Sequence, residues 1–242
     1  MPQPSAEAAM LGEPSYVWRS GQDRRLALIR EYVPLEGQRI LDIGCGIGTY
    51  VRRLRELSPN VNGVDISVKR LQQGAATIPG LVAAVGEHLP FRDDYFDVII
   101  LNEVIEHVNN DRSTLRESLR VISPGGHIVI YAPNRLYPFE THGIYLGKRY
   151  VFGNIPLVNY LPDRLRHRLV PHARAYRDGD LQKLIGGLAA RVVVHGYVYP
   201  GFDNVAARNA LAAKVLRGLL YRAEHTSVRH FGLSHFLILR KR

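Results

Sequence analysis

Cysteine is almost absent from this sequence, because Cys45 is the only one among 242 residues. No intramolecular disulfide can form, so a reducing compartment is the expected environment. Long apolar runs are also absent: no stretch of about 18 apolar residues occurs, which is the length that spans a bilayer. The first fifteen residues, MPQPSAEAAMLGEPS, lack the basic-then-apolar order of a secretory signal. Together these absences predict a cytoplasmic protein.

Negative charge is scarce relative to positive charge, with 22 acidic against 32 basic side chains and a net charge of +10. An excess of this kind favours acidic partners such as nucleic acid, phospholipid headgroups or anionic substrates. The C-terminal half carries much of it in scattered arginines, and no basic strand is interleaved with aromatic residues as in RNA-binding modules. Nucleic acid is therefore not the expected partner, and the composition carries no signal for an oligomeric state.

Strand and helix patterns alternate along most of the chain. Short apolar runs predict strands, several of them buried and parallel, at 39–44, 61–65, 81–86, 96–102, 127–133, 190–200 and 230–242. Helical spacing of apolar residues predicts helices at 24–33, 49–57, 68–76, 111–122, 178–188 and 205–223. We expect Asp111 to cap the fourth of these helices and the SPGG segment at 123–126 to form a turn. This alternation predicts an α/β fold with a doubly wound, mostly parallel sheet.

The alternation of strand and helix patterns stops between residues 136 and 176, a segment rich in aromatics, Pro, Gly and His. A segment this long after a core strand favours a lid or binding insertion. We therefore expect an N-terminal helical segment at 1–36, a core at 37–135, the insertion at 136–176 and a C-terminal completion of the sheet at 177–242. Six aromatic side chains either line an apolar ligand pocket or form a small core of the insertion: Tyr137, Phe139, Tyr145, Tyr150, Phe152 and Tyr160.

The helix expected at 205–223 carries a broad apolar arc, with Lys214 and Arg217 opposite. Two interpretations remain open, because such an arc packs against a sheet or lies on an anionic membrane surface. The second interpretation makes peripheral membrane contact an expectation. The arc comprises Leu211, Ala212, Val215, Leu216, Leu219 and Leu220.

A glycine loop lies in ILDIGCGIGTY, residues 40–50, between a predicted strand and a predicted helix. Glycines let the backbone turn tightly and approach a ligand, and the following helix N-terminus offers free amides. Asp65 ends the next strand, where an acid accepts hydrogen bonds from the ribose hydroxyls of an adenosine cofactor. Thr49 stands where a dinucleotide site would have its third glycine, so the loop predicts a different adenosine cofactor. The D-x-G-x-G-x-G arrangement consists of Asp42, Gly44, Gly46 and Gly48.

Five segments together resemble the class I S-adenosylmethionine-dependent methyltransferases, in the group that includes the quinone-biosynthesis enzymes. They are ILDIGCGIG, VDIS, GEHLPFRDDYFDVI, NEVIEHV and SPGGHIVIYAPN, between about residues 37 and 135. The resemblance implies a seven-stranded sheet with an antiparallel last strand and S-adenosylmethionine across the ends of the first strands. Relatives commonly carry an Asp where Val85 stands, so the adenine amino group is expected to bind the backbone or Glu87.

The resemblance also implies a set of cofactor-binding residues. Cys45 lies within the loop, and with no general base beside it in sequence we interpret it as structural rather than nucleophilic. The implied set is Asp42 and the loop residues Gly44, Cys45, Gly46 and Gly48 around the methionine part, Asp65 at the ribose, Ile66 on the adenine face, Gly86, Glu87 and His88 at the adenine edge, and Asn102 on the sulfonium side.

The segment NEVIEHV, residues 102–108, follows an apolar strand directly. If it turns into a helix, Glu103, Glu106 and His107 share one face and can chelate a divalent cation, for which oxygen-rich ligands favour Mg²⁺ or Mn²⁺ over zinc. The pattern is similar to metal-binding segments of small-RNA 2′-O-methyltransferases and quinone O-methyltransferases, where a later His completes the site. His142 and His172 follow here, and His172 matches better by its place before a late helix. Many relatives carry the motif without a metal, so a role in orienting cofactor and water stays open.

The expected function is methyl transfer from S-adenosylmethionine to a small-molecule or lipid-like acceptor, on oxygen in the first instance. Positioning of donor and acceptor supplies most of the acceleration, and a base is needed only when the acceptor is a hydroxyl. The candidate catalytic side chains are Glu106, His107 and His172. Two alternatives remain, an RNA 2′-O-methyltransferase with a divalent metal and a non-catalytic cofactor-binding scaffold. The lack of an RNA-binding appendage argues against the first, and the intact glycine loop with Asp65 argues against the second.

Overall fold

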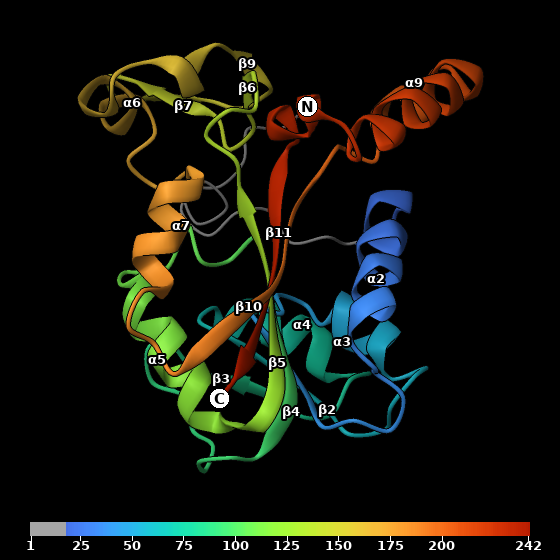
Figure 1. Cartoon of the computed structure of the whole chain (residues 1–242), viewed down its shortest axis with the longest axis vertical. Helices are drawn as coiled ribbons and strands as arrows, with labels where there is room; N and C mark the ends of the chain where they lie inside the picture. The colour runs from blue at the N-terminus through green and yellow to red at the C-terminus, as the bar shows by residue number, and fades with distance from the viewer. Residues whose placement is uncertain (1–17) are drawn as a thin grey trace.

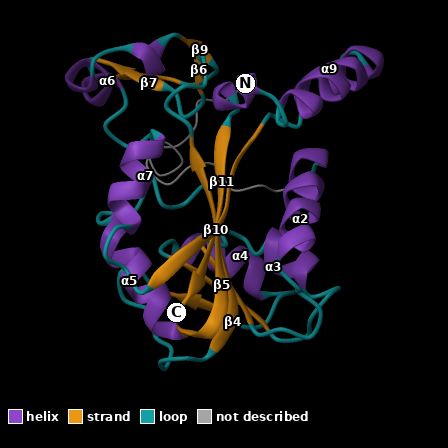
Figure 2. Ribbon diagram, viewed as in Figure 1, coloured by secondary structure: helices purple, strands orange, loops and turns teal. Residues whose placement is uncertain are grey.

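A seven-stranded sheet forms the centre of the computed structural model, which describes residues 18–242 (Figure 1). The strand order is β10-β11-β5-β4-β1-β2-β3, and β11 alone runs antiparallel to its neighbours β5 and β10. The strands of this sheet lie between helices (Figure 2). This confirms the doubly wound α/β fold with its antiparallel last strand. The strands are β1 (Ile40–Ile43), β2 (Val61–Asp65), β3 (Leu81–Ala83), β4 (Phe96–Asn102), β5 (Ile122–Pro133), β10 (Ala190–Val198) and β11 (Ser234–Lys241).

Helices cover both faces of the sheet, because the central strands are apolar on both sides (Figure 1). Successive side chains of a strand point to opposite faces, so β4 sends Val98 and Ile100 to one core and Ile99 and Leu101 to the other. Each of these side chains stabilises the fold by roughly 1.5–3 kcal/mol when fully buried. One core packs under α2 (Ser20–Tyr32), α3 (Thr49–Leu54) and α4 (Val68–Ala75), and the other under α5 (Asp111–Val121) and α7 (Asp178–Ile185).

The insertion forms a separate layer beyond one end of the sheet (Figure 1). It has its own small aliphatic core of Ile144, Val158, Val170 and Ala173. None of the six aromatic side chains belongs to this core or lines the two cavities described below, and Phe139, Phe152 and Tyr160 are exposed. The elements are β6 (Phe139–Glu140) paired with β9 (Ile155–Pro156), β7 (Ile144–Leu146) paired with β8 (Arg149–Val151), the 3-10 helix η1 (Val158–Tyr160) and α6 (Asp163–Leu169).

The segment expected as one helix at 205–223 is two helices, α8 (Asp203–Ala206) and α9 (Ala210–Ala223), followed by the 3-10 helix η2 (Ser227–Phe231). The side chain of Asn209 caps α9 by accepting a hydrogen bond from the Ala212 amide, which starts a new helix there. Helix α9 projects away from the sheet (Figure 1), and Ala213 is its only fully buried residue. The interpretation that the apolar arc packs against the sheet is therefore wrong. In the described part of the chain, no helix combines the length and apolarity needed to cross a membrane.

Two local predictions also need correction. Asn110 rather than Asp111 caps α5, since its side chain accepts a hydrogen bond from the Ser113 amide at 2.9 Å. The SPGG segment is part of the long strand β5 rather than a separate turn, with Gly125 in the left-handed region at φ 77°. Of the predicted N-terminal helical segment, residues 1–17 lie outside the described residues, and α2 occupies much of the rest.

Candidate active site

The glycine loop joins β1 to α3 in a conformation that only glycine adopts readily. Gly44, Gly46 and Gly48 have φ angles of 74°, 57° and 82°. At Gly44 space is also lacking, because a Cβ would lie 2.4 Å from Cγ2 of Val104. The Asp65 carboxylate fixes this loop by accepting hydrogen bonds from the amides of Gly46 and Ser67, both at 2.8 Å. The acid at the end of β2 thus positions the loop.

Two further groups of the loop are buried and uncharged at neutral pH. Burial, and then the charge of Asp65, raise the pKa of Asp42 to about 8. Burial also raises the pKa of the Cys45 thiol, whose Sγ lies against β2, where a Cβ on Gly63 would approach it to 2.7 Å. A buried neutral thiol is a poor nucleophile. The environment of Cys45 therefore favours the structural interpretation.

A cavity of 720 Å³ opens beside this loop, within the size range of small-molecule sites. Ile66 is 52% exposed and offers an apolar face to it. His88, in contrast, is exposed and does not line this cavity, although the resemblance implies a role for it at the adenine edge. The predicted cofactor residues that do line it are Gly44, Asp65, Ile66, Gly86 and Glu87.

A second cavity, of 490 Å³, adjoins the first, and the two share Gly44, Arg70, Glu103 and His107 in their walls. Gly48 lines neither cavity. The predicted cofactor residues that line the second cavity are Asp42, Gly44, Cys45, Gly46 and Asn102. Sequence reasoning missed three side chains in these walls, Arg25, Tyr50 and Arg70, because no local pattern sets them apart from ordinary helix residues.

The NEVIEHV segment is a series of turns rather than a helix, because Glu103 adopts φ 57°, in the left-handed region. Glu103 accepts hydrogen bonds from Arg25 at 2.7 Å and from the Ser234 hydroxyl at 2.5 Å. Burial opposes ionisation of Glu103, but Arg25 outweighs it and lowers the pKa of this carboxyl. The predicted shared face of Glu103, Glu106 and His107 is therefore wrong, since Glu103 is held by a different set of partners.

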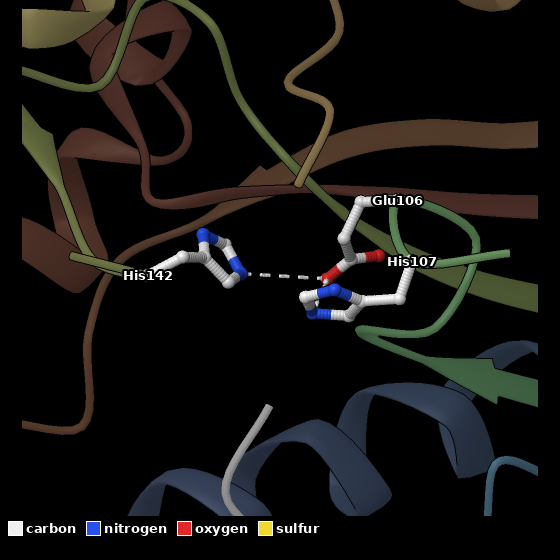
Figure 3. Close-up of side chains that lie close together, drawn as sticks. All are labelled: Glu106, His107 and His142. Carbon is white, nitrogen blue, oxygen red and sulfur yellow. Dashed lines mark ion pairs between the residues drawn. The ribbon is translucent and has the colours of Figure 1, made fainter. Parts of the chain in front are cut away.

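Glu106 and His107 instead meet His142 from the insertion, as Figure 3 shows. The Oε1 atom of Glu106 lies 3.8 Å from Nε2 of His107 and 3.7 Å from Nε2 of His142. Glu106 is 1% exposed, and neither of its carboxylate oxygens has a hydrogen-bond partner. Burial raises the pKa of Glu106 to about 7. His142 rather than His172 thus completes the cluster.

Hydrogen bonds on the far side of each ring fix the two imidazoles. The Nδ1–H of His107 donates to the carbonyl of His172 at 3.0 Å, and burial lowers the pKa of His107 to about 4, so its Nε2 is a free acceptor. The Nδ1 of His142 lies 2.9 Å from Glu140. Burial alone would lower the pKa of His142, but Glu106 and Glu140 outweigh it and raise the value to about 10. Arg166 pairs with the other oxygen of Glu140 at 2.6 Å.

These three side chains fit a divalent cation. Their donor atoms all lie within 4.8 Å of one another. The Glu106 carboxylate has no hydrogen-bond partner, so both of its oxygens are available to a cation. Metal-ligating histidines usually donate their second N–H to a carbonyl or carboxylate, as His107 and His142 are placed to do. One carboxylate and two imidazoles suit a transition metal better than Mg²⁺, which prefers oxygen. The donor set therefore does not favour the expected magnesium.

His172 takes a separate position in the wall of the large cavity. Its Nε2–H donates to the carbonyl of His142 at 3.0 Å, while its Nδ1 is buried and has no hydrogen-bond partner. Burial lowers the pKa of His172, so the ring is neutral at pH 7 and Nδ1 carries a lone pair. Such a nitrogen can accept a proton or a hydrogen bond from a bound molecule.

Parts of the chain are similar to known methyltransferases. Residues 41–130 match the model described as a methyltransferase domain. The chain is 31% identical over 141 residues to the ubiquinone biosynthesis O-methyltransferase of Ralstonia nicotianae, covering 54% of this chain and 58% of that protein. It is 37% identical over 111 residues to the demethylmenaquinone methyltransferase of Clavibacter sepedonicus, covering 44% and 45%. The alignments thus span about half the length of these relatives.

A solved structure shares the fold over nearly the whole chain. The S-adenosylmethionine-dependent methyltransferase from Mesorhizobium loti superposes with a TM-score of 0.63 at 20% identity, covering 92% of this chain and 98% of that one. At this level of identity the likeness shows the fold.

Proposed function

The core at residues 41–130 belongs to the methyltransferase-domain family, and from that premise we propose that the chain transfers a methyl group from S-adenosylmethionine to a small-molecule or lipid-like acceptor, on oxygen. One of the relatives is named a ubiquinone biosynthesis O-methyltransferase. We infer a hydroxyl acceptor for this chain because proton-accepting and metal-ligating groups gather where the acceptor would bind.

One observation supports this proposal above the others: the large cavity is lined both by residues expected to bind the cofactor and by candidate catalytic residues. Asp65 and Ile66, which we expect to bind an adenosine, line this cavity. Glu106, His107 and His172 line it too, contributed by the turn after β4 and by the insertion. A single cavity that holds both sets can align a donor and an acceptor, and alignment is the main source of acceleration in methyl transfer.

The residues of the chain then have distinct roles. S-adenosylmethionine, when bound, would supply an activated methyl group for the acceptor oxygen, and its sulfur would keep the electron pair of the broken bond. The hydroxyl proton must leave, and His172, which lines the cavity and whose buried Nδ1 has no hydrogen-bond partner, is a base that could accept it. Glu106, His107 and His142 would hold a divalent cation, which supplies the charge that favours the deprotonated hydroxyl. Glu140 and His172, through the bonds described above, keep the two rings oriented.

An RNA acceptor is the weaker candidate. Three arginines line the cavity on the insertion side, but Arg135 pairs with Asp163, Arg166 pairs with Glu140, and Arg174 donates to backbone carbonyls. Phosphate binding would have to compete with these internal partners. A scaffold role is disfavoured as well, because an unpartnered buried carboxylate destabilises the fold and serves no purpose in a passive protein.

Calorimetry with S-adenosylmethionine tests the proposal. We expect Asp65→Asn to weaken binding by roughly 10- to 100-fold, since a hydrogen bond to a charged group contributes about 1.5–3 kcal/mol. Asp93→Ala is the matched control, because Asp93 is an exposed carboxylate that does not line either cavity. Absence of binding by the unmodified chain, or equal affinity in the Asp65 variant, would remove the basis of the proposal.

A further inference from the structure

A second cluster of metal-ligating groups lies where α7 meets the edge of the sheet, outside the cavities described above. Asp178 begins α7, His195 lies on β10 and His235 lies on β11. One donor atom from each lies within 4.8 Å of the others. Nothing in the proposed methyl transfer uses these three side chains.

The geometry of the cluster is close to that of a tetrahedral metal site. The Nε2–H of His195 donates to the Nδ1 of His235 at 3.2 Å, a proton that a metal ion would replace, and Oδ1 of Asp178 lies 3.8 Å and 3.7 Å from these two nitrogens. Tetrahedral zinc with bonds of about 2.0–2.1 Å separates its ligand atoms by about 3.3 Å. Movements of a few tenths of an ångström would bring all three donors to bonding distance.

The hydrogen bonds around the cluster orient the donors correctly. His235 is 1% exposed, and its Nε2–H donates to the carbonyl of Tyr176 at 2.8 Å, which leaves the lone pair on Nδ1 inside the cluster. The Tyr197 hydroxyl donates to Asp178 Oδ1 at 2.5 Å, and His230 lies 2.9 Å from that hydroxyl. A carbonyl behind a ligating imidazole and a donor behind a ligating carboxylate are the outer partners that metal sites usually have.

We propose that Asp178, His195 and His235 bind a zinc-class divalent transition-metal ion. Imidazole nitrogens with one carboxylate are ligands that zinc accepts, and three protein ligands leave a fourth position for water. That position is open to solvent, since the side chains of His195 and Asp178 are 24% and 44% exposed.

The ion would tie together three elements that are distant in sequence. Tyr176, whose carbonyl holds His235, lines the large cavity and precedes Asp178 by two residues. The amide of Tyr176 also donates to Pro133 at the end of β5. A metal at this position therefore anchors the segment that leads from the cavity wall into α7. Binding of the ion is independent of whether the chain transfers methyl groups.

Cobalt spectroscopy of the 242-residue chain tests the site. Four-coordinate Co²⁺ absorbs much more strongly in the visible range than Co²⁺ in water, and Zn²⁺ displaces it. The parent is a Glu106→Gln chain, so that the cluster in Figure 3 contributes little. We expect this parent to bind one equivalent of Co²⁺ with the strong band, and Zn²⁺ to abolish the band.

The variants then assign the ion to its ligands. Adding His195→Asn or Asp178→Asn should weaken Co²⁺ binding by at least about 10-fold, since even outer partners of a metal site contribute 10- to 100-fold. His225→Asn is the matched control, because His225 is exposed and lies outside the cluster. Circular dichroism of each variant without metal should match that of the parent. A parent without the strong band, or a band that survives both ligand substitutions, overturns the proposal.

Discussion

At the scale of single residues, Glu106 is the side chain that most needs an explanation. A buried carboxylate without a hydrogen bond is costly, and the protein tolerates it here beside two histidines held in fixed orientation. Its pKa near 7 and the pKa of His142 near 10 mean that protons occupy the cluster at neutral pH. A cation that binds there must displace them, so cation affinity is linked to pH.

The first prediction follows from this competition. Mn²⁺ affinity should rise from pH 6 to pH 8 by at least about 10-fold, because Glu106, with a pKa near 7, and His142, with a pKa near 10, must both lose a proton to ligate. The sign is fixed because both groups bind a proton at pH 6 and ligate only without it. Electron paramagnetic resonance of free Mn²⁺ measures the affinity. In Glu106→Gln we expect weak binding with less dependence on pH, and tight, pH-independent binding in either protein would contradict the model.

Metal removal gives a second prediction at this scale. Treatment with EDTA should abolish methyl transfer to a hydroxyl acceptor, and Mn²⁺ should restore it better than Mg²⁺, because two of the three donors are imidazoles. Rates with each added ion, compared with those of a mock-treated sample, are the measurement. Activity that ignores the chelator would leave Glu106, His107 and His142 with the orienting role instead.

At the scale of elements, the sequence predicts the parts whose pattern is local. The apolar runs of β1, β2, β4 and β5 and the glycine loop follow from short segments read alone, and the structure has them within a few residues. The turn after β4 does not follow, because Glu103 takes a left-handed conformation while bonded to Arg25 and Ser234, which are 78 and 131 positions away. The place of His142 in the site could not be predicted for the same reason, because His142 reaches the site only through the fold of the insertion.

Helix α9 carries the third prediction. Its exposed face presents Leu211, Val215 and Leu219, which are 72%, 51% and 62% exposed, beside the exposed Lys214 and Arg222. An apolar face flanked by basic residues binds anionic lipid surfaces. We expect the protein to float with vesicles that contain anionic lipid and not with neutral ones. Substituting Ser at all three apolar positions should abolish flotation without lowering the melting temperature, since these side chains are not part of the core.

The control for α9 is a chain with Val192→Ser and Val193→Ser, which removes two exposed apolar side chains from β10 instead. This chain should float like the unmodified protein. Flotation that persists after the α9 substitutions would assign membrane contact to another surface, and absence of flotation in all chains would leave the acceptor as a water-soluble molecule.

At the scale of the whole molecule, the sheet and the insertion complete one site together. The sheet supplies the loop after β1, the acid at the end of β2 and the turn after β4, all at the carboxyl edge where ligands bind in doubly wound folds. The insertion supplies His142 and His172, so neither part alone has a full set of proton-accepting and metal-ligating groups. The family match covers residues 41–130, so it bears on the residues proposed to bind the cofactor more than on those of the insertion.

The central claim is methyl transfer from S-adenosylmethionine to a small or lipid-like acceptor, and methyl labelling tests it most directly. The chain is incubated with S-adenosylmethionine carrying a tritiated methyl group and with separate lipid, small-molecule and RNA fractions of a cell extract. The account predicts label in the lipid or small-molecule fraction, reduced by Asp65→Asn and unchanged by Asp93→Ala. Label confined to RNA, or no label in any fraction from a chain that binds the cofactor, would contradict it.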